Sequence, residues 1–165
     1  MRVYLIGFMA SGKSWLGKEL AEASGLDFID IDDLFEERYR ITILDFFNKY
    51  GEDLFRTFER ELLKETMVLD NVIVATGGGV PCYLDNMDMI LQAGISIYLR
   101  VSVPDLMTRI KGIKKKRPLL KNVETTQLEQ YVREMLVNRE PYYLKADFVF
   151  DGPEYPVEEI LRIMK

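Results

Sequence analysis

The sequence predicts an α/β protein in which a five-stranded parallel sheet is covered by helices on both faces. Two observations lead to this fold class. Short apolar segments with strand character alternate with helical segments, which is typical of parallel sheets with right-handed crossovers. Glycine or acidic residues also follow the first three strands, at the edge where such sheets bind ligands. We therefore expect a three-layer α/β/α arrangement with its working site at the carboxyl ends of the strands.

The first strand and the first helix are joined by a glycine-rich loop. The strand is the apolar run 2–6, and the helix covers 15–24 and closes at Gly25. Between them the residues Gly7-Phe8-Met9-Ala10-Ser11-Gly12-Lys13-Ser14 match the motif G-x-x-x-x-G-K-[ST], here called the phosphate loop. The order strand, loop, helix is the context that this motif requires.

The remaining elements follow from apolar periodicity and from capping residues. Further strands are expected at 27–32, 71–76, 95–101 and 146–150. Helices are expected at 33–40, 42–50, 52–69, 84–93 and 156–165. Ser102 opens another helix that stops near Gly112, and a capping box at 126–129 opens a helix that Pro141 should kink or end.

Composition excludes several classes of protein. The 165 residues, without repeats or linkers, predict one domain spanning 1–165, and the apolar stretch 3–10 is too short to span a bilayer. The net charge of -5 argues against bulk attraction to nucleic acid. The absence of histidine excludes Ser-His-Asp and Cys-His catalysis. The single cysteine, Cys82, excludes an intrachain disulfide and fits a reducing cytoplasm.

The phosphate loop predicts a polyphosphate site. Backbone N–H groups and the positive end of the following helix form a cradle for phosphates. Lys13 is expected to reach the outer phosphates and the Ser14 hydroxyl to hold Mg²⁺. The alternative, a plain glycine turn between a core strand and a helix, does not require the Lys-Ser pair.

Two acidic residues end the second strand. Asp30 and Asp32 stand two positions apart, so both carboxylates can face one pocket. Mg²⁺ held by Ser14 and Asp30 would relieve their repulsion and leave Asp32 to face an acceptor hydroxyl. The alternative is a solvated acidic turn that caps the next helix.

Arg56 and Glu59 lie three apart on one helix face, so Glu59 can orient a guanidinium that suits a carboxylate ligand. A surface ion pair is the alternative. Gly78 and Gly79 either bring bare N–H groups against a ligand or simply form a tight turn. Arg139 either adds a second fork to the acceptor pocket or lies on a helix surface.

A basic run at 114–117 lies between Gly112 and Pro118. We interpret about 112–124 as a mobile lid that closes over ATP, with Arg117 stabilising charge on the transferred phosphoryl group. The alternative is a solvated basic loop.

Together these motifs resemble shikimate kinase over nearly the whole chain. The resemblance rests on the phosphate loop, Asp30-Ile31-Asp32, Gly51-Glu52-x-x-Phe55-Arg56-x-x-Glu59, Gly77-Gly78-Gly79, Arg117-Pro118-Leu119-Leu120 and Arg139-x-Pro141-x-Tyr143-x-x-x-Asp147. It implies a fold similar to the nucleoside monophosphate kinases and transfer of the ATP γ-phosphoryl group to the 3-hydroxyl of shikimate, a step towards chorismate and the aromatic amino acids. It also implies a cytoplasmic monomer that binds small molecules and neither nucleic acid nor membrane.

The resemblance assigns a role to each matching position. It places Mg²⁺ on Ser14 and Asp30, catalysis on Lys13, Asp32 and Arg117, and the acceptor between helices at about 33–62. Shikimate would contact Asp32, Arg56, Gly78, Gly79 and Arg139, and Glu59 would support this site. ATP would meet Ala10, Ser11, Gly12, Lys13, Ser14, Trp15 and Arg117. The adenine contacts stay open, because the expected arginine position is Ile110, between Arg109 and Lys111.

Two other functions are compatible with these residues. One is a kinase of another small acceptor, such as gluconate or a nucleotide. The other is a nucleotide-gated binding module whose lid is read by a partner protein. A GTPase switch is disfavoured because no Asn-Lys-x-Asp guanine motif is present.

Overall fold

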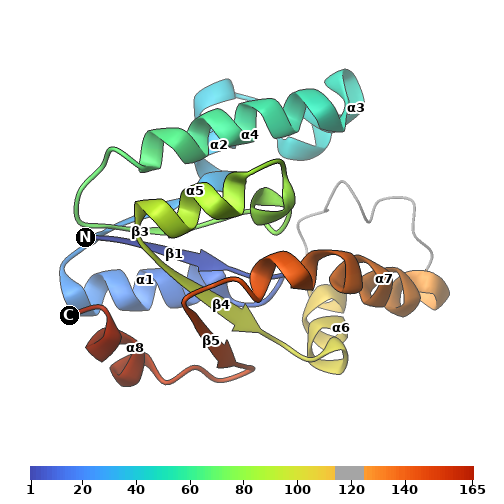
Figure 1. Ribbon diagram of the computed structural model, residues 1–165. Helices are drawn as coiled ribbons and strands as arrows, with labels where there is room; N and C mark the ends of the chain where they lie inside the picture. Colours follow the sequence, from blue (N-terminus) through green and yellow to red (C-terminus); the bar gives the residue numbers. More distant parts are fainter. Residues whose placement is uncertain (114–124) are drawn as a thin grey trace.

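A five-stranded parallel sheet forms the centre of the molecule (Figure 1). The computed structural model describes residues 1–113 and 125–165. The strands are β1 (Arg2–Ile6), β2 (Asp27–Asp30), β3 (Val72–Ala75), β4 (Ile95–Arg100) and β5 (Phe148–Asp151). Their order in the sheet is β2-β3-β1-β4-β5, with every neighbouring pair parallel. The predicted fold class is confirmed.

Helices cover both faces of this sheet. They are α1 (Lys13–Ser24), α2 (Ile31–Tyr39), α3 (Ile43–Tyr50), α4 (Glu52–Thr66), the short 3₁₀ helix η1 (Val80–Cys82), α5 (Asn86–Ala93), α6 (Val103–Lys111), α7 (Thr125–Tyr143) and α8 (Val157–Ile163). Figure 1 shows α1 and α8 on one face of the sheet and α5 on the other, with α2, α3 and α4 grouped beyond α5. None of the helices within 1–113 and 125–165 is long and apolar enough to span a membrane.

The strand register fixes where the chain emerges from the sheet. Leu5 of β1 is paired with Ala75 of β3, which is also paired with Asp30 of β2. One row across the sheet therefore carries the last or nearly last residue of three strands. The segments that follow these residues are the phosphate loop, the glycine turn (Gly77–Gly79) and the start of α2. Consequently, the sheet alone brings all three to one edge.

An aromatic cluster joins the helices beside this edge. The Phe35 ring of α2 lies 5.1 Å from that of Phe46 in α3 and 5.0 Å from that of Phe55 in α4, and all three side chains are buried. Edge contacts of this kind favour a fixed ring geometry as well as burial. The cluster therefore fixes α4, and with it the adjacent Arg56, relative to α2.

Several element boundaries differ from those expected. The second strand ends at Asp30 rather than at residue 32, so Asp32 lies in the first turn of α2. The segment before α5 forms η1, and α5 begins at Asn86 rather than at residue 84. The helix α7 continues through Pro141 and ends at Tyr143. The earlier start of α2 places Asp32 on a helix rather than at the end of a strand.

Candidate active site

The phosphate loop has the backbone conformation of an anion cradle. Gly7 and Gly12 have φ angles of 149° and 98°, and Ala10 has a φ of 62°. A Cβ on Gly7 would lie 2.8 Å from the Leu99 carbonyl oxygen, so this position accepts only glycine. Gly12 stands at the N-cap of α1 without a side-chain cap, so the positive end of the helix opens onto the loop.

Lys13 is buried within the phosphate loop. Its ammonium group donates to the carbonyl oxygens of Gly7 and Phe8, at 2.8 Å each, and lies 3.4 Å from Ser11 Oγ. These contacts hold the only ammonium of the loop beneath the cradle rather than in solvent. Its contact with a phosphate stays a prediction.

Asp30 links the loop to α2. Its Oδ2 accepts a hydrogen bond from the Ser14 hydroxyl, and its Oδ1 accepts one from the Asp32 backbone N–H at 2.9 Å. Asp30 is therefore the N-cap of α2, which was the alternative interpretation of this acidic pair. The same carboxylate also touches the Ser14 hydroxyl expected to bind Mg²⁺, and its contact with the ion stays a prediction.

A cavity of about 520 Å³ opens in front of the loop. This volume lies within the range of small-molecule sites. Its lining residues come from the phosphate loop, α1, α2, the glycine turn and α6, namely Met9, Ala10, Gly12, Lys13, Ser14, Trp15, Asp30, Asp32, Asp33, Thr76, Gly77, Gly78, Arg109 and Ile113. The structure thus brings the predicted metal residues Ser14 and Asp30 into one cavity with most of the predicted phosphate residues and with Asp32 and Gly78 of the acceptor set. Ser11, Arg56, Gly79 and Arg139 do not line it; Arg56 and Arg139 instead lie against Gly79 and Gly78 of the glycine turn.

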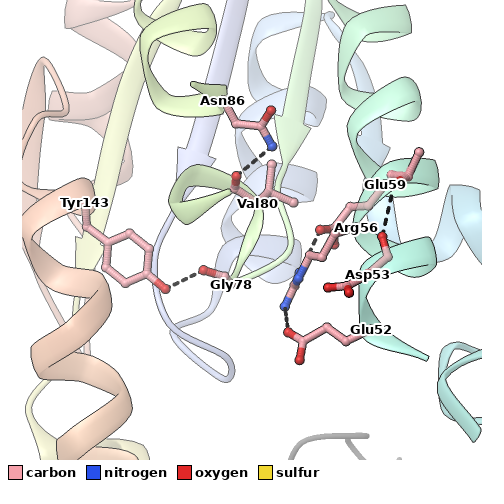
Figure 2. Close-up of polar contacts among 9 residues, drawn as sticks. Glu52, Asp53, Arg56, Glu59, Gly78, Val80, Asn86 and Tyr143 are labelled. Carbon is pink, nitrogen blue, oxygen red and sulfur yellow. Dashed lines mark hydrogen bonds and ion pairs between the residues drawn. The ribbon is translucent and has the colours of Figure 1, made fainter. Parts of the chain in front are cut away.

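The Arg56 guanidinium is buried against the glycine turn. Nη1 donates to Glu59 Oε1 at 2.7 Å, and Nη2 lies 3.4 Å from Glu52 Oε1, as Figure 2 shows. Arg56 is 9% exposed and Glu59 is 2% exposed. This burial excludes the surface ion pair that spacing alone allowed. A Cβ on Gly79 would lie 2.4 Å from Arg56 Nη2, so glycine is needed there for the guanidinium to fit.

The other two glycines of the turn also contact charged groups. A Cβ on Gly77 would lie 2.8 Å from Glu59 Oε2 and 3.1 Å from Asp32 Oδ1. A Cβ on Gly78 would lie 3.1 Å from Arg139 Nη1. Asp32, Arg56 and Arg139, from three different helices, therefore converge on one turn.

Arg139 also contacts the nucleotide side of the site. Its guanidinium carbon lies 5.7 Å from the centre of the Phe8 ring, and Phe8 is a buried member of the phosphate loop. Such a cation–π contact favours one orientation of the guanidinium. Arg139 is thus held by the loop and the turn together, rather than lying on an ordinary helix surface.

Burial dominates the electrostatics of Glu59. Loss of solvent raises the pKa of its carboxyl group from 4.5 to about 7, the Arg56 guanidinium opposes this, and the nearby Asp32 carboxylate adds to it. The site therefore contains a carboxyl group that titrates near neutral pH. It stands directly behind the Arg56 guanidinium.

Arg109 and Tyr155 support the phosphate loop from outside, which the sequence analysis did not assign. Arg109 donates to the carbonyl oxygens of Ala10 at 3.0 Å and Pro153 at 2.9 Å. The Tyr155 hydroxyl donates to the Ser11 carbonyl oxygen at 2.6 Å. The adjacent Ile110 is buried in the core. Of the residues around the expected adenine position, Arg109 is therefore the one that reaches the phosphate loop, and the adenine contacts stay open.

The predicted lid, including Arg117, falls almost entirely outside the described residues. Within 1–113 and 125–165, no group of three or more His, Cys, Asp or Glu side chains could hold a metal ion. A magnesium site built from one carboxylate, one hydroxyl and ligand phosphates needs no such group.

Comparison with known proteins gives one consistent result. The family model described as "SKI: Shikimate kinase" matches residues 9–164. A shikimate kinase of Parabacteroides distasonis is 41% identical over 157 residues, which cover 95% of this chain and 91% of that protein. A shikimate kinase of Flavobacterium psychrophilum is 41% identical over 170 residues, covering 99% and 98%.

Solved structures agree. The crystal structure of shikimate kinase from Bacteroides thetaiotaomicron superposes with a TM-score of 0.90 at 34% identity, covering 99% of this chain and 96% of that one. Shikimate kinase from Acinetobacter baumannii in complex with shikimate has a TM-score of 0.89 at 32% identity, covering 99% and 89%. A gluconokinase from Sinorhizobium meliloti, with a TM-score of 0.59 at 17% identity, shares the fold alone.

The raised pKa of Glu59 predicts a pH-dependent stability. The folded state keeps its proton up to about pH 7, whereas the unfolded chain releases it near 4.5. The stabilisation is therefore complete below pH 4.5 and is lost as the pH rises to about 7. Relative to Glu59→Gln, the free energy of unfolding of the wild type should fall between pH 5 and 7, by up to about 1.4 kcal/mol per pH unit.

Urea denaturation at several pH values measures this difference. The matched control is Glu52→Gln, which removes the half-exposed partner of Arg56 and should keep the wild-type pH slope. Parallel pH curves for the wild type and Glu59→Gln would contradict the prediction.

Proposed function

Since this chain belongs to the shikimate kinase family and is a kinase that phosphorylates shikimate with ATP in the shikimate pathway, we propose which of its residues bind ATP and Mg²⁺, which bind shikimate and which catalyse the transfer. We propose that the accepting group is the 3-hydroxyl of shikimate and that the reaction takes place in the cavity between the phosphate loop and the glycine turn. The observation that carries the proposal is the convergence of Asp32, Arg56 and Arg139 on this turn, beside the phosphate loop.

The phosphate side of the cavity is the proposed ATP site. Residues 10–15 surround the phosphates, and Lys13 moves from the carbonyl oxygens of the loop to the outer phosphates when these arrive. Arg109, whose side chain crosses from the loop to Pro153, forms the adjoining wall where the adenine end lies. Arg117 would stabilise charge on the transferred phosphoryl group.

Ser14 and Asp30 are the proposed holders of Mg²⁺. Their Oγ and Oδ2 atoms are in direct contact at the cavity wall, and hydroxyl and carboxylate oxygens are the donors that Mg²⁺ prefers. When bound, the ion neutralises charge on the phosphate oxygens. The residues present therefore fit the ion.

The acceptor side recognises one carboxylate and a hydroxyl. Arg56 and Arg139 offer two guanidinium forks next to Gly79 and Gly78, so a single carboxylate is held in a fixed orientation. Asp32 lines the cavity beside Gly77, orients the accepting hydroxyl and takes its proton late in the transfer. Glu59 keeps Arg56 in place.

The wider context is also a proposal. We infer a cytoplasmic monomer that binds small molecules and neither nucleic acid nor membrane. The net charge of -5 supports the lack of nucleic-acid binding and the single cysteine supports the cytoplasm, whereas the monomer rests on the family resemblance alone.

The choice of acceptor is tested with purified protein, Mg-ATP and a coupled assay of ADP release. We expect shikimate to support turnover, because its carboxylate and ring hydroxyls match two arginines and one aspartate. Gluconate and nucleoside monophosphates should give turnover lower by at least about tenfold. Faster turnover with either of them than with shikimate would refute the assignment.

Loss of Asp32 or Lys13 should abolish most of the turnover. Asp32→Asn should lower kcat by about 10²-fold to 10⁴-fold, because the acceptor loses its orienting base. Lys13→Ala should lower kcat by at least about 10²-fold, because charge on the phosphates loses a fixed cation.

Asp33→Asn, which changes a neighbouring carboxylate of the same cavity, is the control and should retain kcat within a few-fold. Near-normal kcat in either variant, with an unchanged Tm, would remove that residue from the mechanism.

Arg139→Ala should act on shikimate rather than on ATP. We expect the shikimate KM to rise by more than about tenfold, because one of the two carboxylate forks is lost. Arg133→Ala, on the exposed face of the same helix, is the control and should leave the KM unchanged. An unaltered shikimate KM for Arg139→Ala would place Arg139 outside the pocket.

A further inference from the structure

The glycine turn is held by side chains that the reaction does not use. At its start, the Thr76 backbone N–H and hydroxyl both donate to the Leu5 carbonyl oxygen at 3.1 Å. In its middle, the Tyr143 hydroxyl of α7 donates to the Gly78 carbonyl oxygen at 2.5 Å. Just after it, the Asn86 side-chain amide of α5 donates to the Val80 carbonyl oxygen at 2.9 Å. Three consecutive attachments of this kind fix a segment that is otherwise very permissive.

The Tyr143 contact sets the direction of one peptide group. The Gly78 carbonyl and the Gly79 N–H belong to the same planar trans peptide and point in opposite directions. Figure 2 shows Tyr143 and Arg56 on opposite sides of Gly78. Since the carbonyl points to Tyr143, the Gly79 N–H must point to the side of the turn where Arg56 lies. This is the side on which an acceptor carboxylate would be bound.

The Tyr143 side chain is rigid, and its hydroxyl is always protonated. Tyr143 is fully buried, and its ring lies 5.1 Å from that of Tyr98. Burial raises the pKa of its hydroxyl well above the ordinary value, so the group donates at every physiological pH. This hydroxyl is closed off from solvent and donates to the Gly78 carbonyl oxygen, so it is placed to act on the turn.

Asn86, the first residue of α5, likewise donates from a buried side chain to the backbone beside the turn. Its side chain is buried, and its Oδ1 accepts a hydrogen bond from Arg60, whose Nη2 also lies 2.6 Å from Asp85 Oδ1. With its oxygen occupied by Arg60, the amide nitrogen is directed to Val80. The turn is therefore clamped between α7 and α5.

We propose that Tyr143 and Asn86 are positioning residues for shikimate binding: through the carbonyl oxygens of Gly78 and Val80 they orient the backbone of the glycine turn towards the acceptor carboxylate. The inference rests on the proposed function, whose acceptor contacts it deepens. It differs from a purely structural role, which would lower the fraction of folded protein without changing the affinity of the protein that remains folded.

The test compares Tyr143→Phe with Tyr98→Phe. The first removes the hydroxyl that donates to the Gly78 carbonyl oxygen and that also interacts with the Arg139 guanidinium, so Asn86→Asp is needed beside it to test the turn itself. The second removes an equally buried tyrosine hydroxyl, which donates to Glu140 Oε1 at 3.1 Å and does not touch the turn. For Tyr143→Phe we expect the shikimate KM to rise about five- to tenfold, with kcat and the ATP KM within about twofold of wild type. Tyr98→Phe should leave both KM values unchanged, even where its Tm falls equally.

Two further measurements separate affinity from folding. Isothermal titration calorimetry with shikimate gives the dissociation constant together with the competent fraction, so a poorly folded sample is recognised by its stoichiometry. Asn86→Asp keeps an oxygen for Arg60 and removes the donor to Val80, and it should weaken shikimate binding in the same direction.

The outcomes distinguish the two proposals. Unchanged shikimate affinity in both Tyr143→Phe and Asn86→Asp, or an equal loss in Tyr98→Phe, would overturn the positioning role. A wild-type protein that does not phosphorylate shikimate would instead refute the proposed acceptor site, and this is read from the wild-type sample in the same assay.

Discussion

The organisation of this site depends on the close approach of charged side chains to a backbone without Cβ atoms. At Gly79 the Arg56 guanidinium occupies the space that a Cβ would need, and at Gly77 the carboxylates of Asp32 and Glu59 do so. Any larger residue would push these groups apart. Because glycine is conformationally permissive, this close packing requires that the turn be held from outside, which the attachments from α5 and α7 accomplish. Steric exclusion and hydrogen bonding are therefore two parts of one arrangement.

The sheet determines where the glycine turn and its charged neighbours lie. The row that pairs Asp30 with Ala75 and Ala75 with Leu5 places the starts of three connections within one or two strand spacings of each other. Adjacent strands lie about 4.8 Å apart, so the phosphate loop, the glycine turn and α2 must share an edge. The chemistry depends on side chains, but their proximity follows from parallel pairing of buried apolar strands.

Much of this was predictable from local sequence, and the rest was not for identifiable reasons. The phosphate loop, the glycine turn and the pairing of Arg56 with Glu59 depend on residues close together in the chain, so short motifs and helical spacing predict them. Spacing cannot predict burial, which decided between a surface ion pair and a site residue. Contacts between distant segments, such as Tyr143 with Gly78, leave no local pattern. The helix α2 begins at Ile31 rather than at the expected residue 33, because Asp30 fits both a strand end and an N-cap.

The buried ion pair is best understood through orientation rather than stability. A carboxylate removed from water next to a single guanidinium recovers little net free energy, and the raised pKa of Glu59 shows that burial outweighs the attraction of Arg56. A protein that needed only a stable α4 would place apolar residues there. What the pair provides is a guanidinium held at 2.7 Å by one carboxylate and only loosely, at 3.4 Å, by the half-exposed Glu52. Arg56 is therefore fixed in direction, as the proposed contact with an acceptor carboxylate requires, at a cost that the aromatic packing around Phe55 helps to offset.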